Sequence, residues 1–153
     1  MKTRIEKPDC PKPGTAQWCA RAIRTFLADD SPLLIGLLAR IVSKDPRVLI
    51  VGSAMDGRKA LCNASMLAPD LVITDLNMPG MDGRELTHRL KQMRNPPAVV
   101  VATADDTSEA RERCLAAGAN AFLVKAGNLA PQLLSTIQEI FADHYSQPQG
   151  CGM

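Results

Sequence analysis

The sequence predicts a doubly wound α/β domain with a five-stranded parallel sheet. Two observations support this prediction. Five short apolar runs lack polar alternation, which is typical of strands buried on both faces. Amphipathic segments separate these runs, and strands that alternate with helices require right-handed crossovers and a parallel sheet covered on both sides. The predicted strands are residues 23–28, 48–51, 71–74, 98–102 and 121–124.

The segments between the strands carry helix signals. The first helix starts with Ser31 as N-cap and Pro32 at the first helical position, and the pair Asp45 and Pro46 ends it. Three further helices begin with residues that cap helices well, and a long apolar stripe predicts a fifth. The expected starts are Asp56, Asp82 and Thr107, and the fourth helix is expected to end at Gly118.

Apolar residues at helical spacing give these helices an inward face, which would cover the sheet. The expected inward residues are Leu34, Leu37, Leu38 and Ile41 in the first helix, Ala60, Leu61, Ala64 and Leu67 in the second, Leu86, Leu90 and Met93 in the third, and Leu133, Leu134, Ile137, Ile140 and Phe141 in the last.

Length and charge limit the classes of function. The 153 residues suit one domain with short tails: we expect a disordered basic arm at 1–22, the domain at 23–143 and a disordered tail at 144–153. The net charge of +2 is too small to indicate nucleic acid or an anionic membrane as partner. Prolines interrupt the N-terminus, so we expect no secretory signal. The apolar runs elsewhere are too short to span a bilayer, so we expect no membrane span and a cytoplasmic location. We also expect no separate output domain.

The five cysteines are widely spaced and form no metal-binding pair. We interpret them as reduced thiols, with Cys62 and Cys114 as small packing residues on helices. His88, on the third predicted helix, is most simply a surface residue rather than a ligand or a phosphorelay histidine.

Polar residues that carry chemistry follow four of the five predicted strands. Asp29 and Asp30 follow the first strand, Asp75 the third, Thr103 the fourth and Lys125 the fifth. In doubly wound sheets functional groups collect beyond the carboxyl ends of the strands, so these side chains should converge on one edge.

The carboxylates among them indicate a metal. Three carboxylates held together at neutral pH repel one another unless a cation lies between them, and Mg²⁺ accepts such oxygen ligands, with Mn²⁺ as an alternative. An Asp carboxylate can attack phosphorus, and a lysine ammonium and a threonine hydroxyl can stabilise the transferred group.

The motif that starts at Asp75, Asp-Leu-Asn-Met-Pro-Gly-Met-Asp-Gly, together with Asp29-Asp30, Thr103-Ala104 and Lys125, resembles the CheY-like receiver family of two-component signalling over about residues 22–142. The resemblance implies the flavodoxin-like strand order 2-1-3-4-5. It also implies that Asp75 is the phosphoacceptor and that Thr103 and Lys125 bind the phosphoryl oxygens. Mg²⁺ would be held by Asp29, Asp30, Asp75 and the backbone carbonyl of Asn77.

The same resemblance implies a switch. Thr103 would move toward the phosphoryl group, Phe122 would swing inward, and the face made by helix four, strand five and helix five would bind a downstream protein. Asn77 and Asp105 would tune the rate at which water removes the phosphoryl group. A sensor histidine kinase or a phosphotransfer protein would be the donor, and the chain would be a monomer or a phosphorylation-dependent dimer rather than an enzyme.

One departure from the family pattern concerns the loop after Lys125. Similar receivers commonly place a cis-proline there, whereas this chain has Ala126 and Gly127. A cis peptide before alanine costs about 3 kcal/mol more than trans, so the loop is either trans or strained.

Two other functions compete with a phosphorylated receiver. One is a receiver-like adaptor whose output does not depend on phosphorylation. The other is a Mg²⁺-dependent aspartyl phosphatase resembling haloacid dehalogenases, although that family places its nucleophile after the first strand and a second Asp where Asn77 stands here.

Overall fold

The computed structural model describes residues 22–142. Apart from Ala22, the predicted arm and tail lie outside these residues, so the domain boundaries remain a prediction. The elements are β1 (Ile23–Ala28), α1 (Pro32–Val42), β2 (Val48–Ala54), α2 (Gly57–Leu67), β3 (Leu71–Thr74), α3 (Gly83–Leu90), β4 (Ala98–Thr103), α4 (Ser108–Ala116), β5 (Ala121–Val124) and α5 (Leu129–Ile140).

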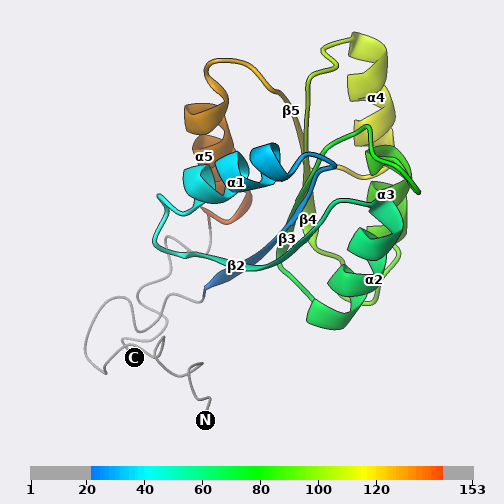
Figure 1. Ribbon diagram of the computed structural model, residues 1–153, viewed down its shortest axis with the longest axis horizontal. Coiled ribbons are helices and arrows are strands. Elements are labelled where there is room, and N and C mark those ends of the chain that lie inside the picture. The colour runs from blue at the N-terminus through cyan, green and yellow to red at the C-terminus, as the bar shows by residue number, and fades with distance from the viewer. Residues whose placement is uncertain (1–21, 143–153) are drawn as a thin grey trace.

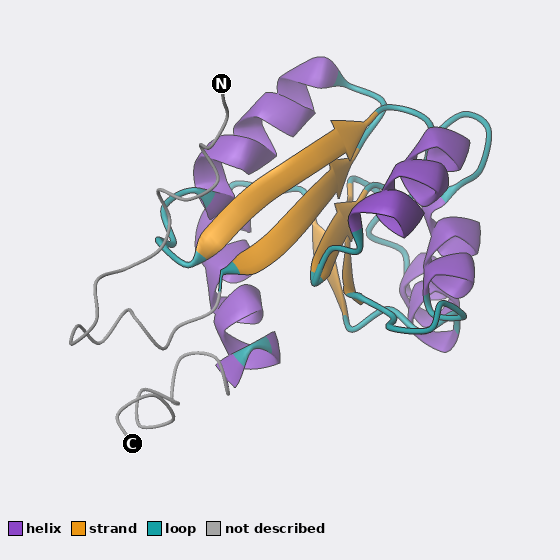
Figure 2. Ribbon diagram, turned by 90° about the horizontal axis from the view of Figure 1, so that it is seen from below, coloured by secondary structure: helices purple, strands orange, loops and turns teal. Residues whose placement is uncertain are grey.

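The five strands form one parallel sheet in the order β2-β1-β3-β4-β5, as expected. Helices α1 and α5 cover one face, and α2, α3 and α4 cover the other (Figures 1 and 2). The chain order reverses between β1 and β3, where the crossovers turn to opposite faces. The predicted doubly wound α/β fold is therefore confirmed.

The sheet separates two hydrophobic cores of different character. On the α1 and α5 face the helices contribute mostly large aliphatic side chains, such as Leu38, Ile41, Leu133 and Ile137. On the other face, α2 and α4 contribute mainly alanines and Cys114. Helix α3, on the same face, contributes the larger Leu86 and Leu90, so the small side chains are confined to α2 and α4.

The prediction that all strands are buried on both faces is wrong for β2. This strand lies at the edge of the sheet and runs on to Ala54, and Leu49 is 44% exposed. An edge strand has a neighbour on one side only, and the register with β1 also shifts between Thr25 and Phe26. An apolar run alone does not distinguish such a strand from a central one.

The helix starts are confirmed at four positions. At each of these positions the side-chain oxygen of the N-cap accepts a backbone N–H of the first turn. The four N-caps are Ser31, Asp56, Asp82 and Thr107. Gly118 follows α4 with a φ of +114°, a positive value that is common for the glycine that ends a helix.

Three side chains expected to pack inward do not lie in helical core positions. Leu37 is 44% exposed because the buried stripe of α1 runs through Leu38, Ile41 and Val42 instead. Cys62 is exposed on α2, whereas Cys114 is buried as expected. Met93 is partly buried but lies beyond the end of α3 at Leu90.

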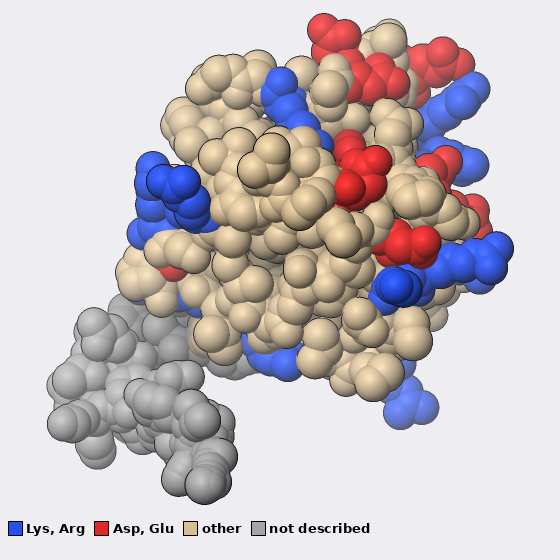
Figure 3. All heavy atoms as spheres, in the orientation of Figure 1, with Lys and Arg blue, Asp and Glu red and all other residues tan. Residues whose placement is uncertain are grey.

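Most of the face seen in Figure 3 is uncharged, and carboxylates gather on the side of α3 and α4, next to several basic side chains. None of the helices within residues 22–142 is long and apolar enough to cross a membrane.

Candidate functional site

Three carboxylates meet at the carboxyl edge of the sheet. Asp29 and Asp30 follow β1, and Asp75 follows the adjacent strand β3. One oxygen from each of the three lies within 4.8 Å of the others. The parallel pairing of β1 and β3 thus brings together residues that are far apart in the sequence.

The three carboxylates differ in exposure and in hydrogen bonding. Asp29 is fully buried, and its Oδ1 accepts the backbone N–H of Ser31 at 3.0 Å. Asp75 is 8% exposed, and its Oδ1 accepts the N–H of Leu76 at 2.7 Å. Asp30 is exposed. The cluster therefore has a buried floor and an open side.

Lys125 supplies the positive charge of the cluster. Its Nζ lies 2.7 Å from Oδ2 of Asp29 and 3.4 Å from Oδ2 of Asp75, and its side chain is 12% exposed. The backbone N–H of Lys125 donates to the carbonyl of Thr103 at 2.7 Å, which fixes the end of β5 against β4. No peptide bond within residues 22–142 is cis, so the Lys125–Ala126 bond is trans.

Thr103 is fully buried at the end of β4. Its Oγ1 accepts the backbone N–H of Asp105 at 3.2 Å. Asp105 in turn accepts both the N–H and the hydroxyl of Thr107. These two hydrogen bonds hold the pKa of the Asp105 carboxyl below its ordinary value, so it stays ionised at neutral pH.

The loop from Asp75 to α3 is held by close backbone packing. Gly57 donates its N–H to Pro79 at 3.1 Å, and Gly83 donates to Leu76 at 2.7 Å. A Cβ on Gly57 would overlap the carbonyl of Met81, and a Cβ on Gly83 would overlap that of Asp75. Only glycine allows this approach, so both positions fix the loop behind Asp75.

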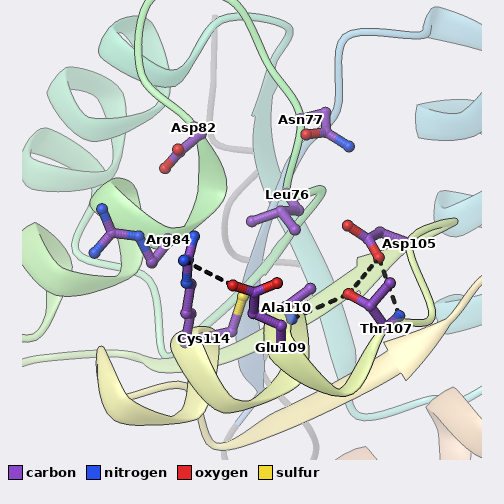
Figure 4. Close-up of a pocket in the computed structure, with 10 residues that line it drawn as sticks. Leu76, Asn77, Asp82, Arg84, Asp105, Thr107, Glu109, Ala110 and Cys114 are labelled. Atoms are coloured by element: carbon purple, nitrogen blue, oxygen red, sulfur yellow. Dashed lines mark hydrogen bonds and ion pairs between the residues drawn. The ribbon is translucent and has the colours of Figure 1, made fainter.

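Asn77, two residues after Asp75, lines a pocket together with Asp105. The pocket lies between α3 and α4 and has a volume of about 220 Å³ (Figure 4). Its walls also include Leu76, the buried Cys114 and Arg113, which pairs with Glu109 at 2.8 Å. Burial, reinforced by the carboxylates of Asp82 and Asp105, raises the pKa of the Cys114 thiol.

The two remaining candidates, Phe122 and His88, are not part of the carboxylate cluster. Phe122 is 5% exposed on β5 and packs into the core beneath α4. His88 is exposed on α3, with its Nε2 3.3 Å from Nε2 of Gln92.

Two features were missed in the sequence. The first feature is the close packing of Gly57 and Gly83, each of which follows the Asp that caps its helix. That position is visible in the sequence, but the backbone segment that packs against each glycine is not. The guanidinium of Arg111 lies over the ring of Phe122, 5.9 Å from its centroid. No spacing rule predicts that contact.

The donor set fits a hard divalent cation. Its ligand atoms are carboxylate oxygens of Asp29, Asp30 and Asp75, without His or Cys, which is the chemistry that Mg²⁺ prefers. One ammonium among three carboxylates leaves an excess of negative charge that a cation would neutralise.

Comparison with known proteins identifies this arrangement. A family model described as the response regulator receiver domain matches residues 25–138. The chain is 36% identical over 102 residues to a protein-glutamate methylesterase/protein-glutamine glutaminase of Methanospirillum hungatei, covering 67% of this chain and 29% of that protein. A protein of the same name from Myxococcus xanthus is 41% identical over 104 residues, covering 67% and 30%.

A solved structure shows the same fold. The response regulator domain of Thermotoga maritima CheB superposes with a TM-score of 0.73 at 28% identity, covering 78% of this chain and 96% of that domain. The chain thus spans about a third of the length of the methylesterases it matches and nearly all of an isolated receiver domain.

Proposed function

The chain belongs to the response regulator receiver family of two-component signalling, and on this premise we propose that Asp75 accepts a phosphoryl group from a histidine kinase or a phosphotransfer protein. The observation that carries the proposal is the cluster of Asp29, Asp30 and Asp75 with Lys125 among them. A nucleophilic carboxylate, a cation site and a fixed ammonium are the groups that phosphoryl transfer to Asp requires.

Asp29, Asp30 and Asp75 would hold Mg²⁺ or Mn²⁺, with the carbonyl of Asn77 as a further ligand. When bound, the ion neutralises charge on the transferring phosphoryl group. Asp29 accepts hydrogen bonds from Ser31 and Lys125, which fix its carboxylate. Asp30, on the open side, is free to turn toward the cation.

The chain's own residues carry the transfer. A carboxylate oxygen of Asp75 forms a bond to phosphorus while the phosphorus–nitrogen bond of the donor's phosphohistidine breaks, and the imidazole takes up a proton as it leaves. The N–H of Leu76 holds Oδ1, so Oδ2, which faces Lys125, is the better placed nucleophile. Lys125 would then shift onto a phosphoryl oxygen, and the hydroxyl of Thr103 would donate to another.

Output would follow from a movement of Thr103, while the ring of Phe122, which already lies inward at 5% exposure, would be held inward in the phosphorylated state. Moving the Thr103 hydroxyl toward a phosphoryl group breaks its hydrogen bond with Asp105, which begins the segment that leads into α4. The face of α4, β5 and α5 would then bind a downstream protein, either as a monomer or as a phosphorylation-dependent dimer. Asn77 and Asp105 would tune the hydrolysis of the acyl phosphate, and the site of action would be the cytoplasm.

Intact-protein mass spectrometry tests the proposal. Incubation with Mg²⁺ and acetyl phosphate should add one base-labile phosphoryl group to the wild type and none to Asp75→Asn. Removal of Mg²⁺ with EDTA should abolish the adduct. A folded wild type that gains no phosphoryl group would favour the phosphorylation-independent adaptor, as would an Asp75→Asn variant that keeps full partner binding.

The two relatives are named as methylesterases, but we do not propose this activity for the present chain. The similarity covers 29–30% of those two proteins, and in this chain it is the receiver family model that matches. An aspartyl phosphatase of the haloacid dehalogenase type is likewise not supported, because Asp75 follows β3 within a receiver fold.

A further inference from the structure

Helix α4 is the least firmly packed helix of the described domain. It buries only Ala110 and Cys114, both small, whereas each of the other four helices buries three or four residues. The pocket of about 220 Å³ further separates it from α3 (Figure 4). Few apolar contacts therefore fix α4, and each remaining contact matters more.

One of these contacts joins α4 to the edge strand β5. The guanidinium carbon of Arg111 lies 5.9 Å from the centroid of the Phe122 ring, within the range of a cation–π interaction. Phe122 is 5% exposed although β5 has a neighbouring strand on one side only. Arg111 itself is exposed and has no carboxylate partner among residues 22–142, so its charge is available to the ring.

The ring is connected to the phosphorylation site through two paired strands. Phe122 pairs with Val101, and Val124 pairs with Thr103. Lys125 then donates its backbone N–H to Thr103. Phe122 is therefore three residues before Lys125 on one strand, and its partner Val101 is two residues before Thr103 on the other. The ring is thus linked through the sheet to the two side chains proposed to bind the phosphoryl group.

We propose that Arg111 is a positioning residue that holds the ring of Phe122 inward and thereby keeps α4 against β5. The ring belongs to the same hydrophobic cluster as Ala110 and Cys114, and the guanidinium lies over it. Without Arg111 the ring would spend more time turned toward solvent, and α4 would be freer to move. In its signalling consequence this inference rests on the proposed phosphorylation of Asp75.

The expected size of the effect is small and measurable. A cation–π contact near the surface shifts an equilibrium between inward and outward rings by about two- to fivefold. Since Arg is charged at all relevant pH values, this shift should not depend on pH between 6 and 9.

Fluorine NMR of protein labelled with 4-fluorophenylalanine tests the contact directly. The chain has three phenylalanines, and Phe122→Leu assigns the relevant signal. The change in fluorine chemical shift between H₂O and D₂O reports the solvent exposure of a ring. The fully buried Phe26 serves as the internal reference for an unexposed ring. Arg111→Ala should raise the exposed population of Phe122 about two- to fivefold, and Arg111→Lys should restore part of the wild-type value.

Arg113→Ala is the matched control. It removes the same charge from the same helix, but Arg113 lines the pocket and pairs with Glu109, not with the ring. Equal responses of the Phe122 signal to Arg111→Ala and Arg113→Ala would overturn the proposal. In a Phe122→Leu background, Arg111→Ala should no longer weaken amide protection in α4, and an undiminished loss there would also overturn it.

Titration with beryllofluoride and Mg²⁺, followed on the same fluorine signals, separates this inference from the proposed function. Wild type should bind this phosphoryl analogue about two- to fivefold more tightly than Arg111→Ala, if the phosphorylated state favours the inward ring as proposed. Equal affinities would refute the coupling to the site. If the wild type bound no beryllofluoride, the proposed function would fail, whereas the difference between the unliganded variants would still establish the contact.

Discussion

Lys125 forms its shorter ion pair with the buried Asp29 and its longer one with the proposed phosphoacceptor Asp75, at 2.7 Å and 3.4 Å. Asp29 is fully buried, so this ammonium is the main compensation for its charge within the described domain. Lys125 therefore stabilises the fold even without a phosphoryl group. Its two partners, Asp29 and Asp75, also belong to the proposed cation site.

Replacing Lys125 should separate these two roles. In Lys125→Met, three carboxylates remain without a cation, and the variant in EDTA should lose roughly 3 kcal/mol of unfolding free energy. Saturating Mg²⁺ should restore more stability to the variant than to the wild type. Urea unfolding with and without Mg²⁺ measures both effects. Lys59→Met, which removes an exposed lysine, is the control, and an equal response of the two variants would contradict the prediction.

Replacing glycine by alanine should stabilise the protein at one position and destabilise it at another. A Cβ on Gly36 meets nothing within 4 Å, so Gly36→Ala in the exposed part of α1 should stabilise the protein by about 0.5–1 kcal/mol. Gly57→Ala should destabilise it by roughly 1–3 kcal/mol, because the methyl group overlaps the Met81 carbonyl. Thermal unfolding ranks the variants. A neutral Gly57→Ala would show that the loop after Asp75 is free to shift.

The cap of α4 should be sensitive to loss of one hydroxyl. The Thr107 hydroxyl oxygen accepts the N–H of Ala110 at 3.1 Å and the hydroxyl donates to Asp105 at 2.8 Å. Thr107→Ala should cost about 1 kcal/mol, increase hydrogen exchange in the first turn of α4 and raise the pKa of Asp105 toward its ordinary value. Amide exchange and carboxyl-carbon titration by NMR check these outcomes. Thr136→Ala, which loses one bond within α5, should leave α4 unchanged.

The buried thiol of Cys114 should make stability fall at alkaline pH. Burial raises its pKa above the ordinary value of 9.0, so above that pH the unfolded thiol loses a proton that the native one keeps. The unfolded state then binds fewer protons, and the free energy of unfolding decreases as pH rises through this window. Urea midpoints from pH 8 to 10 should fall less steeply in Cys114→Ala than in the wild type. Cys62→Ala, at an exposed thiol, should keep the wild-type slope.

The sequence predicts much of the fold, because buried strands and capped helices are local patterns. The residues of β1, β3 and β5 agree with the predicted ranges, and four N-caps lie where their side-chain chemistry indicated. The meeting of Asp29, Asp30 and Asp75 was also predictable, since the carboxyl ends of parallel strands share one edge.

What the sequence does not predict depends on packing between distant segments. Leu37 has the spacing of a core residue, but the direction of the α1 stripe is set by its contact with α5 and the sheet. The overlap that excludes a side chain at Gly57 arises from Met81, and the ring contact of Arg111 depends on where α4 crosses β5. Such relationships need the coordinates of two elements at once.

The placement of the two ends of the described domain has a practical consequence. β1 begins and α5 ends at the edge of the sheet opposite the carboxylates (Figure 1), because the parallel strands all run from that edge toward the acidic cluster. A surface anchor or a fusion partner joined at Ala22 or Ala142 would therefore hold the domain with its acidic cluster facing away from the attachment. Immobilised in either orientation, the domain would present the same face to a soluble phosphodonor, so binding assays on a sensor surface need no choice between the two ends.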